Sequence, residues 1–183
     1  NALVGIGDVL AASKAGSDMA GLAARNVERL EALIAKFPSY VRAYDRLGLC
    51  FEALGKNEEA LEQYRRAVDL NRVQDPQWVW PPLNLGVLQT QMGQFEDAEG
   101  SLQEAVKIDP GFAQAHYRHG LALEKLSRFE DAATALRKAA ELDPEYPDPH
   151  WALARVLRRD GDREGAAAAV REYQRLKAAR EQQ

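Results

Sequence analysis

The sequence predicts an all-α fold, a right-handed superhelical solenoid of about ten helices packed as antiparallel pairs. The main observation is a unit of about 34 residues, clearest in 113–146, that recurs along the chain. Small residues also return at matching places in successive copies, as Gly86, Gly120 and Ala154 do. Apolar residues recur at helical spacing, and no stretch shows the alternation of a strand. Together these observations indicate a stack of helical hairpins.

The composition is that of a chain that folds around a core, with 46% hydrophobic and 28% charged residues. The net charge is −4, and its 24 basic and 28 acidic residues are dispersed, which argues against nucleic acid as a partner. No apolar run approaches the roughly 18 residues of a membrane span, so we expect no membrane insertion. The single Cys50 cannot form an intramolecular disulfide, so the sequence leaves the compartment unknown, and a soluble protein could be cytoplasmic or exported.

The N-terminal region predicts an atypical capping pair. Residues 1–2, Asn-Ala, resemble the scar of an expression tag, and we expect the natural protein to continue upstream. Residues 3–40 then predict two helices, a weak one over 3–14 and a stronger one from 18 to about 37. Ser17 is the expected N-cap of the stronger helix. This pair has few marks of the repeat, as is typical of a terminal unit.

Four clear repeats follow over residues 41–183, and we expect them to form one continuous domain with residues 3–40. The repeats span 41–74, 79–112, 113–146 and 147–180. An insertion at 75–78 separates the first repeat from the second. Tyr173 stands where the other repeats have alanine, which indicates that the array ends with the fourth repeat.

Each repeat carries two small residues where its helices should cross. These pairs are Gly48 with Ala60, Gly86 with Ala98, Gly120 with Ala132, and Ala154 with Ala166. A larger residue there would overpack the contact and cost about 1–3 kcal/mol.

These residues resemble the motif of the tetratricopeptide repeat family. The resemblance rests on Leu47-Gly48, Leu85-Gly86 and His119-Gly120, on Phe51 and Tyr64, and on Pro110 and Pro144. Pro82 and His119 depart from the motif, since bulky or leucine residues are usual at their positions. The resemblance implies that the first helix of each pair lines a concave groove and that this groove binds peptides.

The expected groove residues come from all four repeats. They are Arg42, Asp45, Leu49, Leu83, Asn84, Val87, Tyr117, Arg118, Leu121, Trp151, Arg155 and Arg158. The apolar and aromatic members either form a ligand strip or pack between neighbouring first helices. The arginines near the end, with Arg159 and Arg163, either pair with Asp160, Asp162 and Glu164 or form a pocket for an acidic segment or a phosphate.

Two more specific sites are not expected. Some family members grip C-terminal carboxylates of chaperones with a two-carboxylate clamp, but Asp45, Leu49 and Gln114 occupy three of its places here, and Asp45 would repel the anion. His116 and His119 share one helix face, but they lack further metal ligands nearby, with Cys50 two repeats away. No nucleophile–base grouping or phosphate loop can be assembled, so we expect no enzyme activity, cofactor or metal.

The sequence therefore predicts a protein–protein interaction scaffold that binds a partner peptide or helix. One alternative is an accessory domain of a larger enzyme or of an envelope assembly protein. A further alternative is weak self-association through the N-terminal pair, which would make a homo-oligomer.

Overall fold

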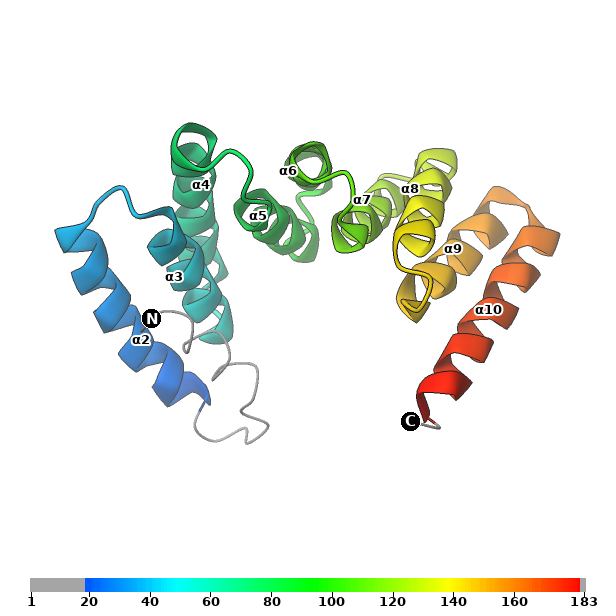
Figure 1. The fold of residues 1–183 in the computed structure, drawn as a ribbon, viewed down its shortest axis with the longest axis horizontal. Coiled ribbons are helices and arrows are strands. Elements are labelled where there is room, and N and C mark those ends of the chain that lie inside the picture. The colour runs from blue at the N-terminus through cyan, green and yellow to red at the C-terminus, as the bar shows by residue number, and fades with distance from the viewer. Residues whose placement is uncertain (1–18, 182–183) are drawn as a thin grey trace. The chain divides into compact units, whose positions relative to one another are not determined.

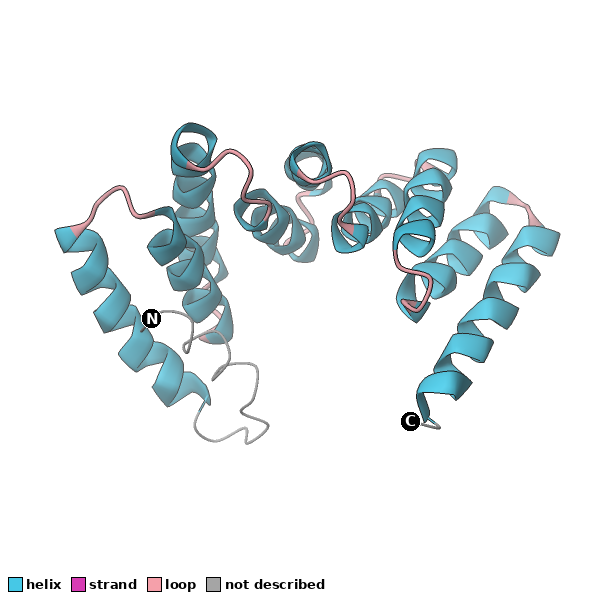
Figure 2. Ribbon diagram, in the orientation of Figure 1, coloured by secondary structure: helices cyan, strands magenta, loops and turns pink. Residues whose placement is uncertain are grey.

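A computed structural model describes residues 19–181 and divides the chain into two compact units, Asn1–Leu88 and Gln89–Gln183. The described residues form nine helices and no strand, which confirms the predicted all-α class (Figures 1 and 2). The expected helix over 3–14 and the expected cap Ser17 lie outside the described residues. One continuous domain over residues 3–183 stays a prediction.

The first unit contains α2 (Met19–Lys36), α3 (Val41–Ala53) and α4 (Asn57–Gln74), followed by most of α5 (Trp80–Gln91). Helix α3 packs against both α2 and α4. The core under α3 includes Val41, Tyr44 and Ala67. Helix α2 therefore packs on α3 as the second helix of one repeat packs on the first helix of the next.

The second unit contains α6 (Phe95–Ile108), α7 (Ala113–Lys125), α8 (Phe129–Leu142), α9 (Pro147–Asp160) and α10 (Arg163–Glu181). Each of these helices packs against the next, so they form successive antiparallel pairs joined by short loops (Figure 2). Leu123, Leu136 and Val156 lie in the core that α7, α8 and α9 share.

The close crossings differ in detail from the expected pairs of small residues. A Cβ atom added at Gly48 would lie 2.5 Å from the Tyr64 ring, and one added at Gly120 would lie 2.7 Å from Cγ of Leu136. Both partners are fully buried. The glycines therefore make room for a bulky side chain one turn beyond the expected alanine, although Gly120 also approaches the Ala132 carbonyl oxygen.

The four-residue insertion lengthens a helix rather than forming the expected separate segment. Helix α4 has 18 residues, whereas the corresponding α6 and α8 have 14 each. The extra turn ends at Gln74, and Asp75-Pro76 then stops the helix as Asp109-Pro110 stops α6. Proline has this effect because it disfavours helical backbone in the preceding residue.

Each first helix of a pair, from α3 onward, is preceded by a turn in which an aromatic residue follows proline by two positions. The backbone N–H of this aromatic residue donates to the carbonyl three residues earlier, at distances of 2.9–3.1 Å. The aromatic residues are Tyr40, Trp78, Phe112 and Tyr146. The repeat thus places one partly buried ring at the start of each first helix.

Candidate functional site

Helices α7 and α9 are the first helices of neighbouring pairs, and they contact each other within the second unit. Tyr117, Leu121 and Glu124 lie one turn apart along α7, and Trp151 and Arg155 do so along α9. We call the set Tyr117, Arg118, Leu121, Glu124, Tyr146, Trp151, Arg155, Arg158 and Arg159 the α7–α9 surface. It includes the groove residues named above for the third and fourth repeats.

Glu124 is the central charge of the α7–α9 surface, although it is only 4% exposed. Arg155 donates from Nε to its Oε1 at 2.7 Å and from Nη2 to its Oε2 at 2.5 Å. Nη1 of Arg159 lies 3.6 Å from Oε1 of the same carboxylate. Arg155 and Arg159 therefore pair with a buried acid on the preceding hairpin, and not with the expected Asp160, Asp162 and Glu164.

The arginine side chains of this network reach solvent. Arg155 is 43% exposed and Arg159 is 57% exposed. The hydrogen bonds to Glu124 raise the pKa of Arg155 further above its ordinary value. Because each guanidinium has five N–H donors and Glu124 engages few of them, both arginines can still donate to a ligand.

Two tyrosines lie together beside this network. The rings of Tyr117 and Tyr146 meet edge to face, with centroids 5.3 Å apart, and Arg118 lies 5.5 Å from the Tyr117 centroid. Burial raises the pKa of Tyr117, and it raises that of Tyr146 to about 12. Both hydroxyls are therefore neutral near pH 7. The buried Nε of Arg118 has no hydrogen-bond partner among the described residues.

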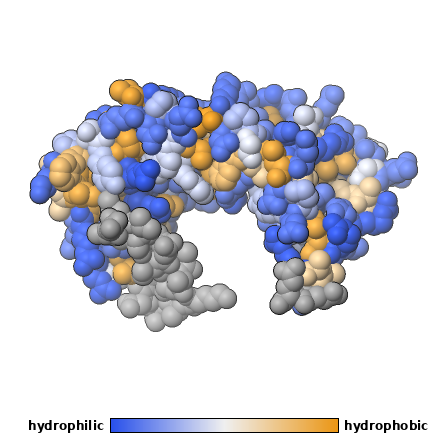
Figure 3. All heavy atoms as spheres, in the orientation of Figure 1, coloured by the Kyte–Doolittle hydropathy of each residue, from blue (hydrophilic) through white to orange (hydrophobic). Residues whose placement is uncertain are grey.

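Trp151 is the exposed aromatic residue of α9. It is 49% exposed, and its ring lies 5.3 Å from that of Tyr173 on α10. Apolar residues otherwise appear as scattered patches among polar ones in the view of Figure 3. A half-exposed tryptophan held by a second ring is suited to act as an anchor for a ligand.

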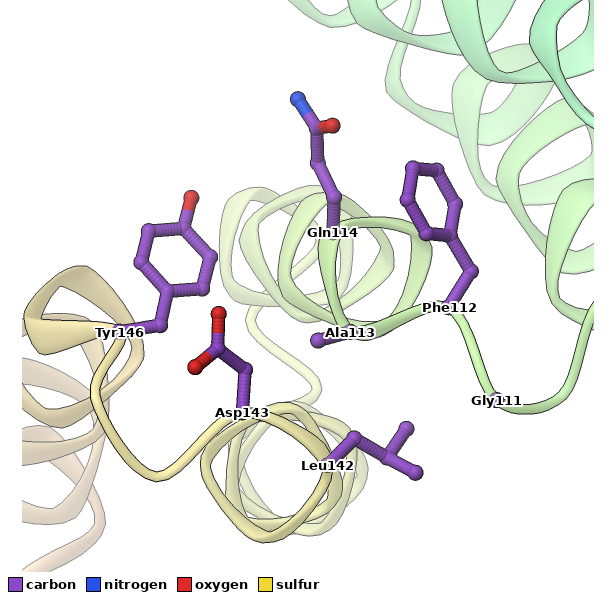
Figure 4. Close-up of a pocket in the computed structure, with 7 residues that line it drawn as sticks. All are labelled: Gly111, Phe112, Ala113, Gln114, Leu142, Asp143 and Tyr146. Carbon is purple, nitrogen blue, oxygen red and sulfur yellow. The ribbon is translucent and has the colours of Figure 1, made fainter.

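A hollow of about 570 Å³ adjoins the α7–α9 surface at the start of α7. Figure 4 shows Phe112 and Tyr146 on either side of Gln114, with the Asp143 carboxylate near Tyr146. Gly111, Ala113 and Leu142 complete the lining. Tyr146 belongs both to this hollow and to the tyrosine pair, so the two features are continuous.

The first unit gathers four of its predicted groove residues around a second hollow of about 260 Å³. Its lining residues are Arg42, Asp45, Arg46, Leu49, Trp78, Trp80 and Asn84. The Arg42 guanidinium lies 5.2 Å from the centroid of the Trp78 ring. Cationic and aromatic side chains therefore surround this hollow.

Asp45 is the buried acid of the first unit, at 2% exposure. Nδ2 of Asn84 donates to its Oδ1 at 2.8 Å. Burial raises the pKa of Asp45 from 3.8 to about 6, although Asn84 and Arg46 oppose this shift. A buried acid thus stands where the chaperone-type clamp needs a lysine, and the amide of Asn84 is engaged with it.

The apolar groove residues differ in exposure. Leu83 is only 1% exposed and belongs to the core, so it presents no surface to a ligand. Leu49, Val87 and Leu121 are partly buried. Leu121 packs against the core shared by α7, α8 and α9. Leu49, Val87 and Leu121 can therefore still contribute apolar surface to a ligand site.

The histidines contact their own neighbours. Nε2 of His116 lies 3.0 Å from the Pro110 carbonyl oxygen, and Nε2 of His119 lies 3.7 Å from Oε1 of Glu99. Burial lowers the pKa of His119. Within residues 19–181, no group of three or more histidine, cysteine, aspartate or glutamate residues is placed to hold a metal.

Sequence reasoning missed the roles of two residues. No buried acid was predicted as the partner of Arg155 and Arg159, and Glu124 takes this role. Tyr146 was not predicted at all. The signal that could have found Tyr146 is the proline–x–aromatic turn, which recurs before each first helix from α3 onward.

The fold and the α7–α9 surface define an all-α protein of repeated helical hairpins. The tetratricopeptide repeat family matches residues 21–76, 83–147 and 117–181. The chain belongs to the tetratricopeptide repeat family. Repeats of this family indicate a protein–protein interaction scaffold, and such a fold is typically non-catalytic.

Two relatives match shorter segments. TPR repeat-containing protein YpiA of Bacillus subtilis is 29% identical over 96 residues, which cover 52% of this chain and 22% of that protein. A UDP-N-acetylglucosamine–peptide N-acetylglucosaminyltransferase of Giardia intestinalis is 32% identical over 74 residues, which cover 40% of this chain and 5% of the enzyme. The chain therefore aligns with less than a quarter of either relative.

Solved structures of MamA share the fold. A MamA double mutant of RS-1 has a TM-score of 0.80 at 21% identity, covering 89% of each chain. MamA from residue 41 onward, of Desulfovibrio magneticus RS-1, has a TM-score of 0.78 at 21% identity, covering 87% of this chain and 88% of the other. At this level of identity the likeness shows the fold alone. No helix in the described part of the chain is long and apolar enough to span a membrane.

Proposed function

We propose that the chain is a non-catalytic scaffold that binds a linear segment of a partner protein along the α7–α9 surface. The observation that carries this proposal is the placement of Tyr117 and Trp151 beside the Glu124–Arg155 ion pair, on two first helices in contact. Exposed tyrosine, tryptophan and arginine are the residues most often responsible for binding energy at protein interfaces.

The packing of this surface supports binding with little reorganisation. Tyr117 packs against Tyr146 and Trp151 against Tyr173, so their rings are held before a partner arrives. Arg155 is held in the same way by Glu124. Side chains that are ordered in advance lose less conformational entropy on binding, which leaves more of the contact energy as affinity.

Non-catalytic binding also fits the chemistry of the surface. Its one buried carboxylate, Glu124, is engaged by Arg155 and Arg159 and is therefore not free to act as a base. Tyr117 and Tyr146 have raised pKa values, which makes them poor nucleophiles near neutral pH.

The test is a selection of binders from a displayed library of random linear peptides, followed by affinity measurement of one selected peptide. Tyr117→Ala and Trp151→Ala should each weaken binding by roughly thirtyfold, since truncating an aromatic anchor costs about 2 kcal/mol. Phe37→Ala is the matched control, because Phe37 is 50% exposed and lies in the other unit.

The melting temperature separates binding from folding in the same experiment. The proposal requires that Tyr117→Ala and Trp151→Ala lose the peptide while the helices stay folded. If both variants keep the peptide, or lose it only because they unfold, the α7–α9 surface is a packing seam and not a binding site.

A second candidate is supported by the short stretch aligned to the Giardia transferase. Because that stretch is 5% of the enzyme, the present repeats could serve as the binding module of a longer protein. The complete open reading frame tests this candidate, since a catalytic domain encoded in the same frame would establish it and a frame confined to these repeats would exclude it.

A further inference from the structure

The α7–α9 surface has the opposite charge to the chain as a whole. The chain has a net charge of −4, yet the exposed side of α9 carries Arg155, Arg158 and Arg159 within two turns. Arg118 of α7 adds a fourth positive charge beside Tyr117. The acids that act on Tyr117 and Tyr146 are Glu124, Asp143 and Asp148, three against the four arginines.

The buried carboxylate of Glu124 gives this positive charge a fixed geometry. It is bidentate with Arg155 and lies within 3.6 Å of Arg159, so one acid from α7 holds two arginines of α9. Both oxygens of Glu124 face these arginines, which leaves little of its negative charge for a cationic ligand. The outward N–H groups of the arginines remain available, and a planar guanidinium matches a carboxylate with two parallel hydrogen bonds.

Aromatic surface lies next to these donors. Trp151 is one turn before Arg155 on α9, and Tyr117 of α7 lies near Arg155. The neutral hydroxyls of Tyr117 and Tyr146 can also donate hydrogen bonds to an anion. A ligand that suits all of these groups is a peptide segment that carries both carboxylates and at least one apolar side chain.

Deepening the proposed function, on which this inference rests, we propose that the α7–α9 surface recognises an acidic protein segment. Carboxylates of the segment bind Arg155 and Arg159, which Glu124 positions, and an apolar or aromatic side chain of the segment packs on Trp151 and Tyr117. Arg158 and Arg118 supply further attraction for acidic residues on either side.

The experiment determines which residues are enriched in peptides selected by the wild-type chain, and how the affinity of these peptides depends on salt. Selected peptides should be enriched in aspartate and glutamate beside an aromatic or leucine residue. Their affinity should fall when salt rises from about 0.1 M to about 1 M, because the screening length drops from roughly 10 Å to 3 Å.

Charge variants locate the site. Arg159→Gln should weaken a selected peptide about tenfold, as expected for a lost charge-assisted hydrogen bond. Because Arg155→Gln alone would leave Glu124 buried without its bidentate partner, the second variant combines Arg155→Gln with Glu124→Gln, and it should weaken binding by a similar factor. The control Arg137→Gln removes the same charge from an exposed site on α8 and should leave the affinity unchanged.

The outcomes separate this inference from the proposed function. Selected peptides could lack acidic enrichment, bind Arg159→Gln as tightly as wild type and lose binding to Tyr117→Ala. This result would overturn the acidic partner and leave the proposed binding surface intact. Peptides that bind both the Tyr117 and the Arg159 variants as tightly as wild type would overturn the acidic partner and the binding surface together. Equally tight binding of single-stranded polyuridine at this surface would also overturn the inference, because charge alone would then suffice.

Discussion

Gly120→Ala is the most direct perturbation of the crossing between α7 and α8. The added Cβ would lie 2.7 Å from Cγ and 2.9 Å from Cδ2 of Leu136, and 3.3 Å from the Ala132 carbonyl oxygen. Favourable carbon–carbon contacts lie at about 3.5–4.0 Å, and Leu136 is fully buried, so the helices must move apart. Overpacking of this kind costs about 1–3 kcal/mol. The better helix propensity of alanine returns roughly 1 kcal/mol.

We therefore expect a net loss of up to about 2 kcal/mol for Gly120→Ala. Gly100→Ala is the matched control, since Gly100 is exposed on α6 of the same unit and an added Cβ meets nothing within 4 Å. It should stabilise the protein by about 0.5–1 kcal/mol. Urea unfolding followed by circular dichroism measures both changes. A Gly120→Ala variant as stable as the Gly100→Ala variant would refute the close crossing.

Two further predictions concern the buried acids. Because folding raises the pKa of Asp45 from 3.8 to about 6, the folded chain holds a proton in this pH window that the unfolded chain has released. Wild type should therefore lose about 3 kcal/mol relative to Asp45→Asn as pH rises from about 3 to about 7, with no further change above; a difference that is flat with pH would contradict the burial of this acid. For the Glu124–Arg155 pair, a double-mutant cycle with alanine at each position should give a coupling of about 1–2 kcal/mol, because the arginine is partly exposed. Additive losses in urea unfolding would show that the pair contributes nothing.

The sequence predicted the helices of this fold well because the helical period and the turn residues are local signals. Proline after Asp109 and Asp143 marks the end of two second helices in the sequence and in the structure, and α4 ends in the same way before Asp75-Pro76. The insertion was misplaced because a longer helix and a longer loop have the same residue count. In the structure the extra turn belongs to α4, and the Asn71 amide donates to the Trp78 carbonyl.

The chemistry of the candidate site was harder to predict because it depends on residues far apart in the chain. Asp45 and Asn84 are 39 residues apart, and Glu124 and Arg155 are 31 apart. The family resemblance placed each of these residues on a first helix, but it could not show which acids are buried. Because Glu124 is buried and pairs with Arg155 and Arg159, these arginines form an ordered pair of donors and not simply a solvated charged face.

A partner segment bound along α7 and α9 must change the environment of residues on these two helices. Amide chemical-shift mapping with one selected peptide detects this change, since each residue reports separately on contact. We expect the largest shifts on the residues of α7 and α9 around Tyr117, Glu124 and Arg155, and we expect Gly100→Ala and Phe37→Ala to leave this pattern in place. Shifts concentrated on α8 and α10, with α7 and α9 unchanged, would contradict it.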